Sequence, residues 1–443
     1  MSAVGRFARN LELEGGVPTV GASGVNVVKF KDYDLQYSNG MPIRYVAFPF
    51  PVAGQPRSVH RGYVEGEDLL SGKPMMQAII DALTEPLTEE EQMEGMPGEA
   101  PPEPRLLGPD TEENLMRLFK DREWTDYNPI VLPTETRVAA MLGGTSRGPE
   151  EVVSRMGSRE LTVEKAAVYA VMAGAKPDYF PAILAILTQA PSFGNSTSSM
   201  ANMIVVNGPA RRELGMNSGT DALGPFSEAN AVLGRTFTIA GKILGDLRLD
   251  VGAYSTLGSN LQYNNLCFAE NEEALPEGWE PLSVETGYAR TDSVVSVGIG
   301  WSLISSVGEA QIRHPPHMLI RDYMRALYGS AATVIMDPTV AGLLKDVHGF
   351  GTKAELGRWL SGNVEVAAGT FWGNGVNTTA STPMALQGLE PFATWLKAPP
   401  ETLVKPFTNP GAVKVVVAGG GIQTTWFVTD FRFGRGIRID DWK

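Results

Sequence analysis

The chain has 443 residues, 43% of them hydrophobic and 20% charged. This composition excludes wholesale disorder and predicts a globular protein. The length indicates more than one ordinary domain. Lys and Arg total 37 against 50 Asp and Glu, a net charge of −13. Residues 85–113 alone carry ten acidic residues and one basic residue. The rest of the chain is therefore close to neutral, and without a basic face we expect no binding to nucleic acid.

The single cysteine, Cys267, excludes an intramolecular disulfide and a cysteine-rich zinc or iron–sulfur site. No apolar run approaches the roughly 18 residues of a membrane span, and the first residues lack the apolar core of a secretory signal. We therefore expect a cytoplasmic protein that does not bind membranes.

Residues 1–125 are interpreted as an irregular N-terminal extension. A short or edge strand is expected at 44–52, where prolines interrupt an apolar run, and a helix at 73–83. The acidic, Pro- and Gly-rich segment 85–110 is interpreted as an exposed linker. The alternative is a docking segment for a basic partner.

The remaining chain alternates helical and strand-like patterns, divided into a first α/β half at 126–310 and a second at 311–443. The first half is predicted to contain a loop at 191–201, strands at 203–207 and 293–300, and helices at 134–142, 149–155, 161–173, 177–187, 210–214 and 226–244. The second is predicted to contain helices at 318–327, 338–347 and 353–360, strands at 333–336 and 413–418, and an aromatic stretch at 426–431.

Two segments, 204–214 and 334–343, share the order strand, turn, proline, helix, which aligns Pro209 with Pro338. The fold class predicted is α/β, with mixed sheets, flanking helices and two related halves beside the extension. Chance similarity of the two segments is the alternative to duplication.

Five segments carry a family resemblance: AVYAVMAGAKPDYFPAILA, MIVVNGPARRELGMNSG, GPFSEANAVLGR, LCFAENEEALPEGWEPLSVETGY and VKVVVAGGG. In this order the chain, from about residue 130 to its end, resembles a poorly characterised bacterial thiol/selenol family associated with a Cys/Sec-Gly-Ser-Cys motif. The resemblance implies an N-terminal α/β thiol domain.

Two departures from that family matter. The Cys/Sec-Gly-Ser-Cys motif is absent, and Ala175 stands where the family usually has cysteine. A redox pair formed from these two sites cannot operate within this chain. The alternatives are a thiol-domain partner subunit, different chemistry in this branch, and an introduced change of cysteine to Ala175.

Candidate substrate-binding residues surround two helix starts. Asn207 precedes a predicted helix start that bears Arg211 and Arg212, where free N–H groups and two guanidinium groups would bind a carboxylate or phosphate. The alternative is that these arginines are ordinary surface residues. The long helix from Phe226 brings Asn230 and Arg235 into an apolar segment, where they either satisfy each other or line a pocket. Arg147 and Asn217 complete the set.

Cys267 is itself a candidate catalytic residue, as a nucleophile, and further candidates follow it in the chain. The acidic residues after it, Glu270 and Glu272 among them, would raise the pKa of the thiol and disfavour a thiolate. The glutamates are therefore the better candidates, as a general base or as ligands of a divalent metal. An exposed acidic turn and a merely buried cysteine are the alternatives. His314 and His317 add a general acid/base or metal candidate.

The triple glycine 419–421 follows a strand, but the G-x-G-x-x-G spacing is absent, so no nucleotide cofactor is predicted. The leading hypothesis is an enzyme, or the large subunit of one, that acts on a small anionic molecule by acid/base chemistry. Lyase, hydrolase and redox classes stay open, and an oligomer is expected. The alternative is a non-catalytic scaffold for a thiol-bearing partner.

Overall fold

Two mixed sheets form the body of the protein. The computed structural model describes residues 2–28, 41–50, 55, 57–94, 105–156, 159–189, 201–245, 247–249, 252–253, 255, 257–307 and 314–443. Helices account for 43% and strands for 17%. Helices flank both sheets, so the predicted α/β class is confirmed. In the described part of the chain, no helix has the length and apolar character needed to cross a membrane.

The first sheet is centred on β5 (Asn202–Asn207), which runs parallel to β8 (Leu266–Ala269) and antiparallel to β9 (Val294–Ile299). Every residue of β5 and β8 is buried. Both faces of these strands are covered, which explains their nearly continuous apolar sequences.

The second sheet repeats this arrangement. Its central strand β11 (Ala332–Met336) runs parallel to β14 (Val413–Val417) and antiparallel to β15 (Thr425–Thr429). In the first half, α12 (Glu228–Leu244) lies between the two parallel strands in the chain, and in the second half α16 (Lys353–Asn363) does so. Both helices begin with side-chain caps, from Ser227 and Thr352.

Each half contributes strands to the sheet of the other half. β10 (Leu303–Val307) follows β9 in the chain but pairs with β15 in the second sheet. Reciprocally, β16 (Arg432–Phe433) follows β15 but pairs with β9 in the first sheet, as does β17 (Ile437–Arg438). The sequence boundary at 310/311 therefore separates strands that belong to the same sheet.

The hydrogen bonds at the carboxyl edges fix how the two halves correspond. The Glu270 N–H donates to the Val206 carbonyl, and the Ala418 N–H donates to the Met336 carbonyl. In this register Asn207 corresponds to Asp337. The first turn has one extra residue, Gly208, and with this insertion Pro209 lies opposite Pro338.

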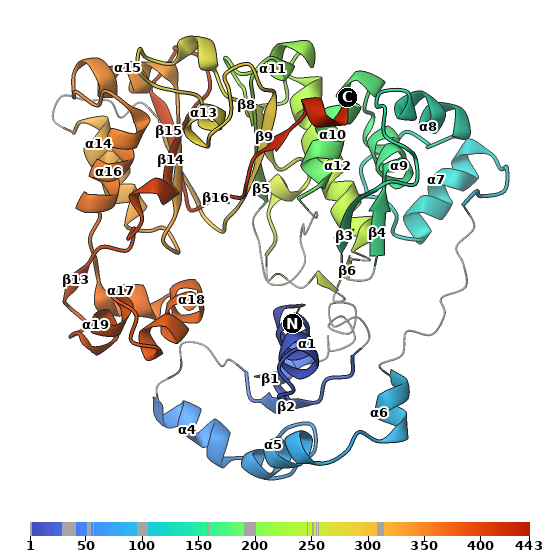
Figure 1. Ribbon diagram of the computed structural model, residues 1–443, viewed down its shortest axis with the longest axis vertical. Helices are drawn as coiled ribbons and strands as arrows, with labels where there is room; N and C mark the ends of the chain where they lie inside the picture. Colours follow the sequence, from blue (N-terminus) through green and yellow to red (C-terminus); the bar gives the residue numbers. More distant parts are fainter. Residues whose placement is uncertain are drawn as a thin grey trace.

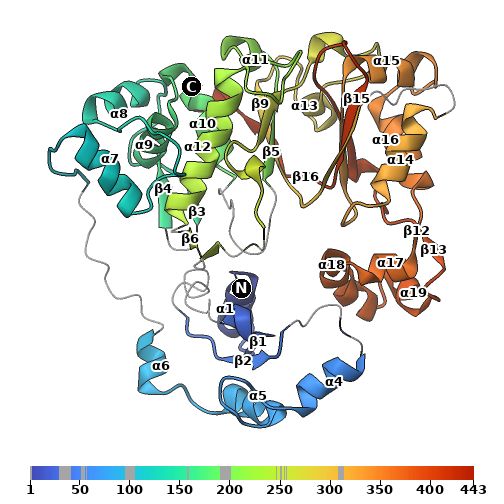
Figure 2. The same ribbon diagram turned by 180° about the vertical axis from the view of Figure 1, so that it is seen from behind.

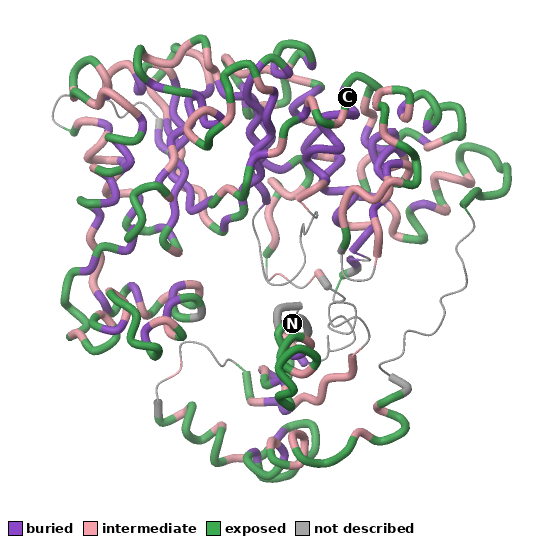
Figure 3. The backbone as a smooth tube through the Cα atoms, in the orientation of Figure 1, coloured by how far each residue is buried: buried purple, intermediate pink, exposed green. Residues whose placement is uncertain are grey.

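Helices cover the outer face of each sheet (Figures 1 and 2). The first sheet packs against α9 (Val163–Ala173), α10 (Phe180–Leu187) and α12. The second packs against α14 (Pro316–Met324), α15 (Pro338–Asp346) and α16. A third apolar cluster joins the inner faces of the sheets through Phe268, Leu282, Ile335 and Val416. The buried residues concentrate in the two sheets and in the helices packed against them (Figure 3).

Smaller elements complete the body. A short hairpin and helix precede the first sheet: α8 (Glu135–Leu142), β3 (Val152–Met156) and β4 (Arg159–Thr162). Short elements of the first half are α11 (Ala210–Glu213), β6 (Arg248–Leu249), β7 (Gly252–Ala253) and α13 (Leu282–Glu285). A helical insertion in the second half contains β12 (Val366–Ala367), α17 (Ala368–Gly373), α18 (Gly375–Leu386), α19 (Phe392–Lys397) and β13 (Leu403–Val404).

The N-terminal segment has its own small apolar cluster around Val46 and Met75. It contains α1 (Ser2–Leu13), β1 (Gly21–Gly24), α2 (Val25–Val28), β2 (Tyr45–Phe48), α4 (Arg57–Glu65), α5 (Met75–Thr84), α6 (Glu89–Glu94) and α7 (Glu112–Asp121). The helix predicted at 73–83 is confirmed as α5. Part of the acidic segment forms α6, and residues 95–104 lie outside the described residues.

Two other local predictions have different outcomes. The helix predicted at 149–155 is wrong, because residues 152–156 form β3, which pairs with β4. The β-branched pair Val152 and Val153 favours the strand. The loop predicted at 191–201 lies outside the described residues apart from Ala201.

Candidate functional site

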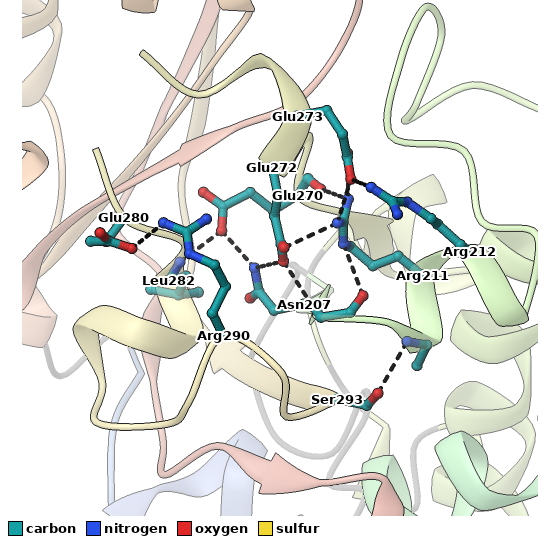
Figure 4. Close-up of polar contacts among 12 residues, drawn as sticks. Asn207, Arg211, Arg212, Glu270, Glu272, Glu273, Glu280, Leu282, Arg290 and Ser293 are labelled. Carbon is teal, nitrogen blue, oxygen red and sulfur yellow. Dashed lines mark hydrogen bonds and ion pairs between the residues drawn. The ribbon is translucent and has the colours of Figure 1, made fainter. Parts of the chain in front are cut away.

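A cluster of charged side chains fills the carboxyl edge of the first sheet (Figure 4). Asn207 is the last residue of β5, and Glu270 directly follows β8. Parallel neighbouring strands end at the same edge, which brings these two residues together, and Asn207 Nδ2 donates to Glu270 Oε2 at 2.7 Å. The same amide donates to Glu272 Oε1 at 3.0 Å, and Asn207 Oδ1 is buried without a partner among the described residues.

Arg211 lies inside this cluster, on α11. Its guanidinium donates to Glu272 Oε2 at 3.0 Å, to both carboxylate oxygens of Glu273, and to the carbonyls of Gly208 and Glu270. Burial alone would lower the pKa of Arg211, but the surrounding carboxylates raise it overall. The hydrogen bonds from Arg211, helped by Arg212, lower the pKa of Glu273 to about 2.

Glu270 is held from both halves of the molecule. Its Oε1 accepts from Lys353 Nζ of α16 at 2.5 Å and from the Val417 N–H. Its Oε2 accepts from Asn207 and from the Leu282 N–H. A carboxylate offers about four lone-pair sites, so Glu270 has none left for a metal ion or a substrate proton.

The cluster therefore brings together part of the predicted site, and its charged groups pair with one another. Its cations are Arg211, Arg212 and Lys353, and its carboxylates are Glu270, Glu272 and Glu273. The charges balance, and the Arg211 guanidinium already has acceptors on all three nitrogens. This geometry disfavours the predicted capture of an anion by Arg211, because the neighbouring glutamates occupy that role.

Arg235 and Asn230 do not join this cluster, although both lie on α12. Arg235 forms two hydrogen bonds with the carboxylate of Asp126, at 2.9 and 3.0 Å, and a third with the Pro129 carbonyl. Burial raises the pKa of Asp126, but the hydrogen bonds from Arg235 and Asn128 lower it overall. Arg211, Asn230, Arg235 and Glu270 therefore do not converge on one cavity.

Arg147 anchors the end of the chain. Its guanidinium pairs with Glu151 at 2.9 Å, donates to the Asp441 carbonyl and lies 4.8 Å from the ring centre of Trp442. The neighbouring Thr145 hydroxyl donates to the Trp442 carbonyl at 2.6 Å. These contacts give Arg147 a structural role.

Cys267 lies in β8, buried among the apolar residues that face α12. Burial raises the pKa of its thiol to about 12. A thiol in this environment is not an activated nucleophile, so the catalytic interpretation of Cys267 is wrong and the interpretation as a small buried hydrophobe fits.

The two histidines of the HPPH segment have separate environments. His314 is exposed. His317 lies in the first turn of α14 and packs among rings, 4.7 Å from His348 and 4.8 Å from Trp359 between ring centres. Burial, with His348 and Arg321 nearby, lowers the pKa of His317 to about 4. Among the described residues, no group of three or more His, Cys, Asp or Glu is placed to hold a metal ion.

A cavity of about 400 Å³ lies at the carboxyl edge of the second sheet. Its lining includes Ile335 and Met336 at the end of β11, Asp337, and residues 418–420, which directly follow β14. Its other walls come from β15 and from residues 220–224 of the first half. In open α/β sheets, the carboxyl ends of parallel strands are the usual place for ligands.

The correspondence between the halves explains why this edge is open. Glu270 and Glu272 of the first half correspond to Ala418 and Gly420 of the second. Large carboxylate side chains therefore fill one edge, while at the other the small Ala418 side chain leaves space and the missing side chain of Gly420 makes room for the 220–224 loop. A Cβ built on Gly420 would lie 2.2 Å from Thr220 Oγ1, so the close approach of the 220–224 loop requires glycine there.

Two of the predicted binding residues build the wall of this cavity. Asn230 donates to the carbonyls of Asn217 and Ala222, at 2.9 and 3.0 Å, and accepts from the Asn217 N–H. The Asn217 side chain donates to the Thr220 carbonyl at 2.8 Å. The Gly419 N–H donates to the Ser218 carbonyl at 2.8 Å, which ties the loop to the second half. Asn217 and Asn230 are therefore supports of the cavity.

Sequence reasoning missed the cavity residues Asp221 and Asp337. The signal for Asp337 is an aspartate that directly follows a buried strand and opens a helix with Pro338. Asp221 carries no such signal, because it reaches the cavity only through the fold of its loop. Among the glycines at 419–421, Gly420 has a role in close packing, because its backbone lies against Thr220.

Comparison of the chain with protein-family models, with curated proteins and with solved structures gives no significant match. The resemblance to the thiol/selenol family therefore stays a prediction, and the geometry described above carries the functional argument.

Proposed function

We propose that the protein binds a small organic molecule in the cavity between β11, β14 and the 220–224 loop, as an enzyme or as the ligand-binding subunit of one. The observation that carries this proposal is the contrast between the two edges: Ala418 and Gly420 line a cavity where the first half has the buried carboxylates of Glu270 and Glu272. A volume of about 400 Å³ falls within the range of small-molecule pockets.

Acid/base chemistry on a molecule bound there would fall to Asp337 and Asp221, the titratable side chains of the cavity lining in the described part of the chain. Phe427, which is partly exposed, supplies aromatic surface on the β15 side. This combination of an apolar wall and a few polar groups is typical of small-molecule sites.

Fragment binding tests the proposal. Saturation-transfer NMR with a small library of neutral aromatic fragments should detect binding to the wild-type protein. Binding should be lost in Gly420→Val, which pushes side-chain atoms toward Thr220, and weakened in Ile422→Trp, which narrows the mouth from an exposed position. Gly362→Ala is the matched control, because a Cβ at Gly362 meets no neighbour. Equal binding by wild type and both cavity variants would contradict the proposal.

A second candidate function is a subunit that receives its reactive thiol from a partner. The supporting observation is that Cys267, the only cysteine, is buried with its thiol pKa raised to about 12. Thiol chemistry of the kind the resemblance implies would then require a second polypeptide. Native mass spectrometry of the protein purified from its source tests this, since a second chain with a reactive cysteine is expected.

A further inference from the structure

The cavity lining has an unbalanced charge. Among its described residues, Asp221 and Asp337 carry formal negative charges, and no lysine, arginine or histidine lines it. The arginines that the sequence offers for an anion lie elsewhere and are paired with carboxylates: Arg211 with Glu272 and Glu273, and Arg235 with Asp126.

Asp337 caps the N-terminus of α15, which would otherwise attract an anion at this edge. Its Oδ1 accepts from the N–H groups of Thr339 at 2.7 Å and Val340 at 3.1 Å, so it caps α15. Its Oδ2 accepts from the Thr425 N–H. The partial positive charge at the start of the helix is therefore already offset by a carboxylate. Of about four lone-pair sites on the carboxylate, one remains for a donor on a ligand.

Asp221 places a second carboxylate at the cavity. Its backbone has a positive φ of 57°, a conformation that Asp adopts more readily than most residues. The turn is closed by the Gly224 N–H, which donates to the Asp221 carbonyl at 2.8 Å. Its side chain has no hydrogen bond or ion pair with another described residue, and it is exposed. The loop therefore presents a carboxylate that is available to a ligand.

Apolar side chains accompany these two carboxylates. Ile422 and Leu223, which line the cavity, are 80% and 37% exposed. Exposed apolar side chains beside a cavity favour a ligand with an apolar body, because binding removes their surface from water.

We infer that the cavity selects an uncharged or cationic organic molecule with an apolar body and at least one hydrogen-bond donor, and discriminates against organic anions. This inference rests on the proposed function, since it names the ligand class of the same site. It also reverses the charge of the substrate that the arginine-rich segments predict.

Three probes of matched shape test the inference: 4-methylbenzylammonium, 4-methylbenzyl alcohol and 4-methylbenzoate. Their dissociation constants are measured by NMR titration of the full chain. For a carboxylate in contact with the ligand, the cation should bind at least about tenfold more tightly than the anion. Asp221→Asn should reduce this ratio, and added salt should reduce it as well, because Asp221 is exposed. The control Asp178→Asn removes an exposed aspartate outside the cavity lining and should leave the ratio unchanged.

The possible failures are distinguishable. If 4-methylbenzoate binds as tightly as the ammonium probe, and binding is weakened in Gly420→Val and Ile422→Trp, the inference on charge is overturned and the proposed function stands. If no probe binds the wild type, or the cavity variants bind all probes unchanged, the cavity is not the site and both proposals fall. Ile422→Trp keeps the test valid where Gly420→Val does not fold, because residue 422 is exposed.

Discussion

Lys353 Nζ lies 2.5 Å from Glu270 Oε1, and both side chains are almost completely buried, with exposed fractions of 1% and 0%. Lys353 belongs to the second half and Glu270 to the first. The pair joins the halves at the filled edge of the first sheet. It also shows why that edge is closed, since the charge that Glu270 brings into the interior is neutralised from across the molecule.

Removal of the ammonium group should destabilise the protein strongly. Lys353→Met leaves the Glu270 carboxylate buried without its cation, and we expect a loss of about 3–5 kcal/mol in the free energy of unfolding, measured by urea denaturation. Lys405→Met, in which a half-exposed lysine loses a partner 3.9 Å away, should cost less than about 1 kcal/mol. The double variant Lys353→Met, Glu270→Gln should recover part of the loss. Similar losses of stability in Lys353→Met and Lys405→Met would contradict the importance of the buried pair.

Arg235→Ala should change stability rather than ligand binding. The substitution removes the cation that faces the buried Asp126, so we expect a loss of about 1–3 kcal/mol in the free energy of unfolding. The pKa of Asp126 is lowered in the folded protein. Its contribution to stability is therefore present above its unfolded pKa and is lost as the pH falls through its folded value. Urea titrations at neutral and acidic pH should show a smaller acid sensitivity in Arg235→Ala than in wild type. A weaker affinity for the cavity probes at unchanged stability would argue against this structural role.

His317 should make the protein sensitive to mild acid. Its pKa falls from 6.5 to about 4 on folding, so the unfolded chain binds a proton first as the pH decreases. Stability is then lost progressively from about pH 6.5 down to about pH 4. His317→Phe keeps a ring beside Trp359 but cannot bind this proton. Its free energy of unfolding should therefore change less than that of the wild type between about pH 6.5 and about pH 4. His60→Phe, an exposed histidine in α4, is the control.

Gly234 should tolerate no side chain. It lies on α12, and a Cβ there would meet the Asn264 carbonyl oxygen at 1.7 Å and Cys267 Cβ at 3.0 Å. Gly234→Ala should therefore cost about 3 kcal/mol in the free energy of unfolding. Gly362→Ala, on α16 with open space around it, should stabilise the helix by about 0.5–1 kcal/mol. Thermal unfolding of the two variants side by side gives opposite shifts in Tm if this packing is correct.

Cys267 should react with thiol reagents only when the protein unfolds. Burial and the raised pKa of its thiol keep the thiolate fraction low. Ellman's reagent should therefore release about one equivalent of chromophore in denaturant and almost none from the native protein within minutes. Rapid labelling of the native protein would restore Cys267 as a candidate nucleophile.

The sequence predicts well those parts of the fold that depend on local patterns. The buried strands at Met203 and Val334 and the capped helices after Thr134 and Thr352 follow from hydrophobic runs and capping residues. The helices of the insertion, such as α18, were not predicted, because their Gly-, Thr- and Ser-rich sequence has low helix propensity and packing decides their structure.

The site was predicted less well because its residues meet through long-range pairing. Sequence proximity correctly grouped Arg211 with Asn207, and the structure brings them together with Glu270. The same reasoning could not show that Glu272 and Glu273 would neutralise Arg211, or that Arg235 faces Asp126, more than a hundred residues away. The cavity depends on the absence of large side chains at positions 418 and 420. Small residues such as Ala418 and Gly420 carry no chemical signal in a single sequence.

The exchange of β10 and β16 has a consequence for how the gene could be divided. A break between residues 310 and 311 would send β10 away with the first fragment, although it completes the sheet of the second, and would send β16 away with the second. Each fragment would lack at least one strand of its own sheet. Co-expressed fragments should therefore bind each other through β10 and β16. The molecule is suited to split-reporter complementation, and neither half is expected to fold as an independent domain.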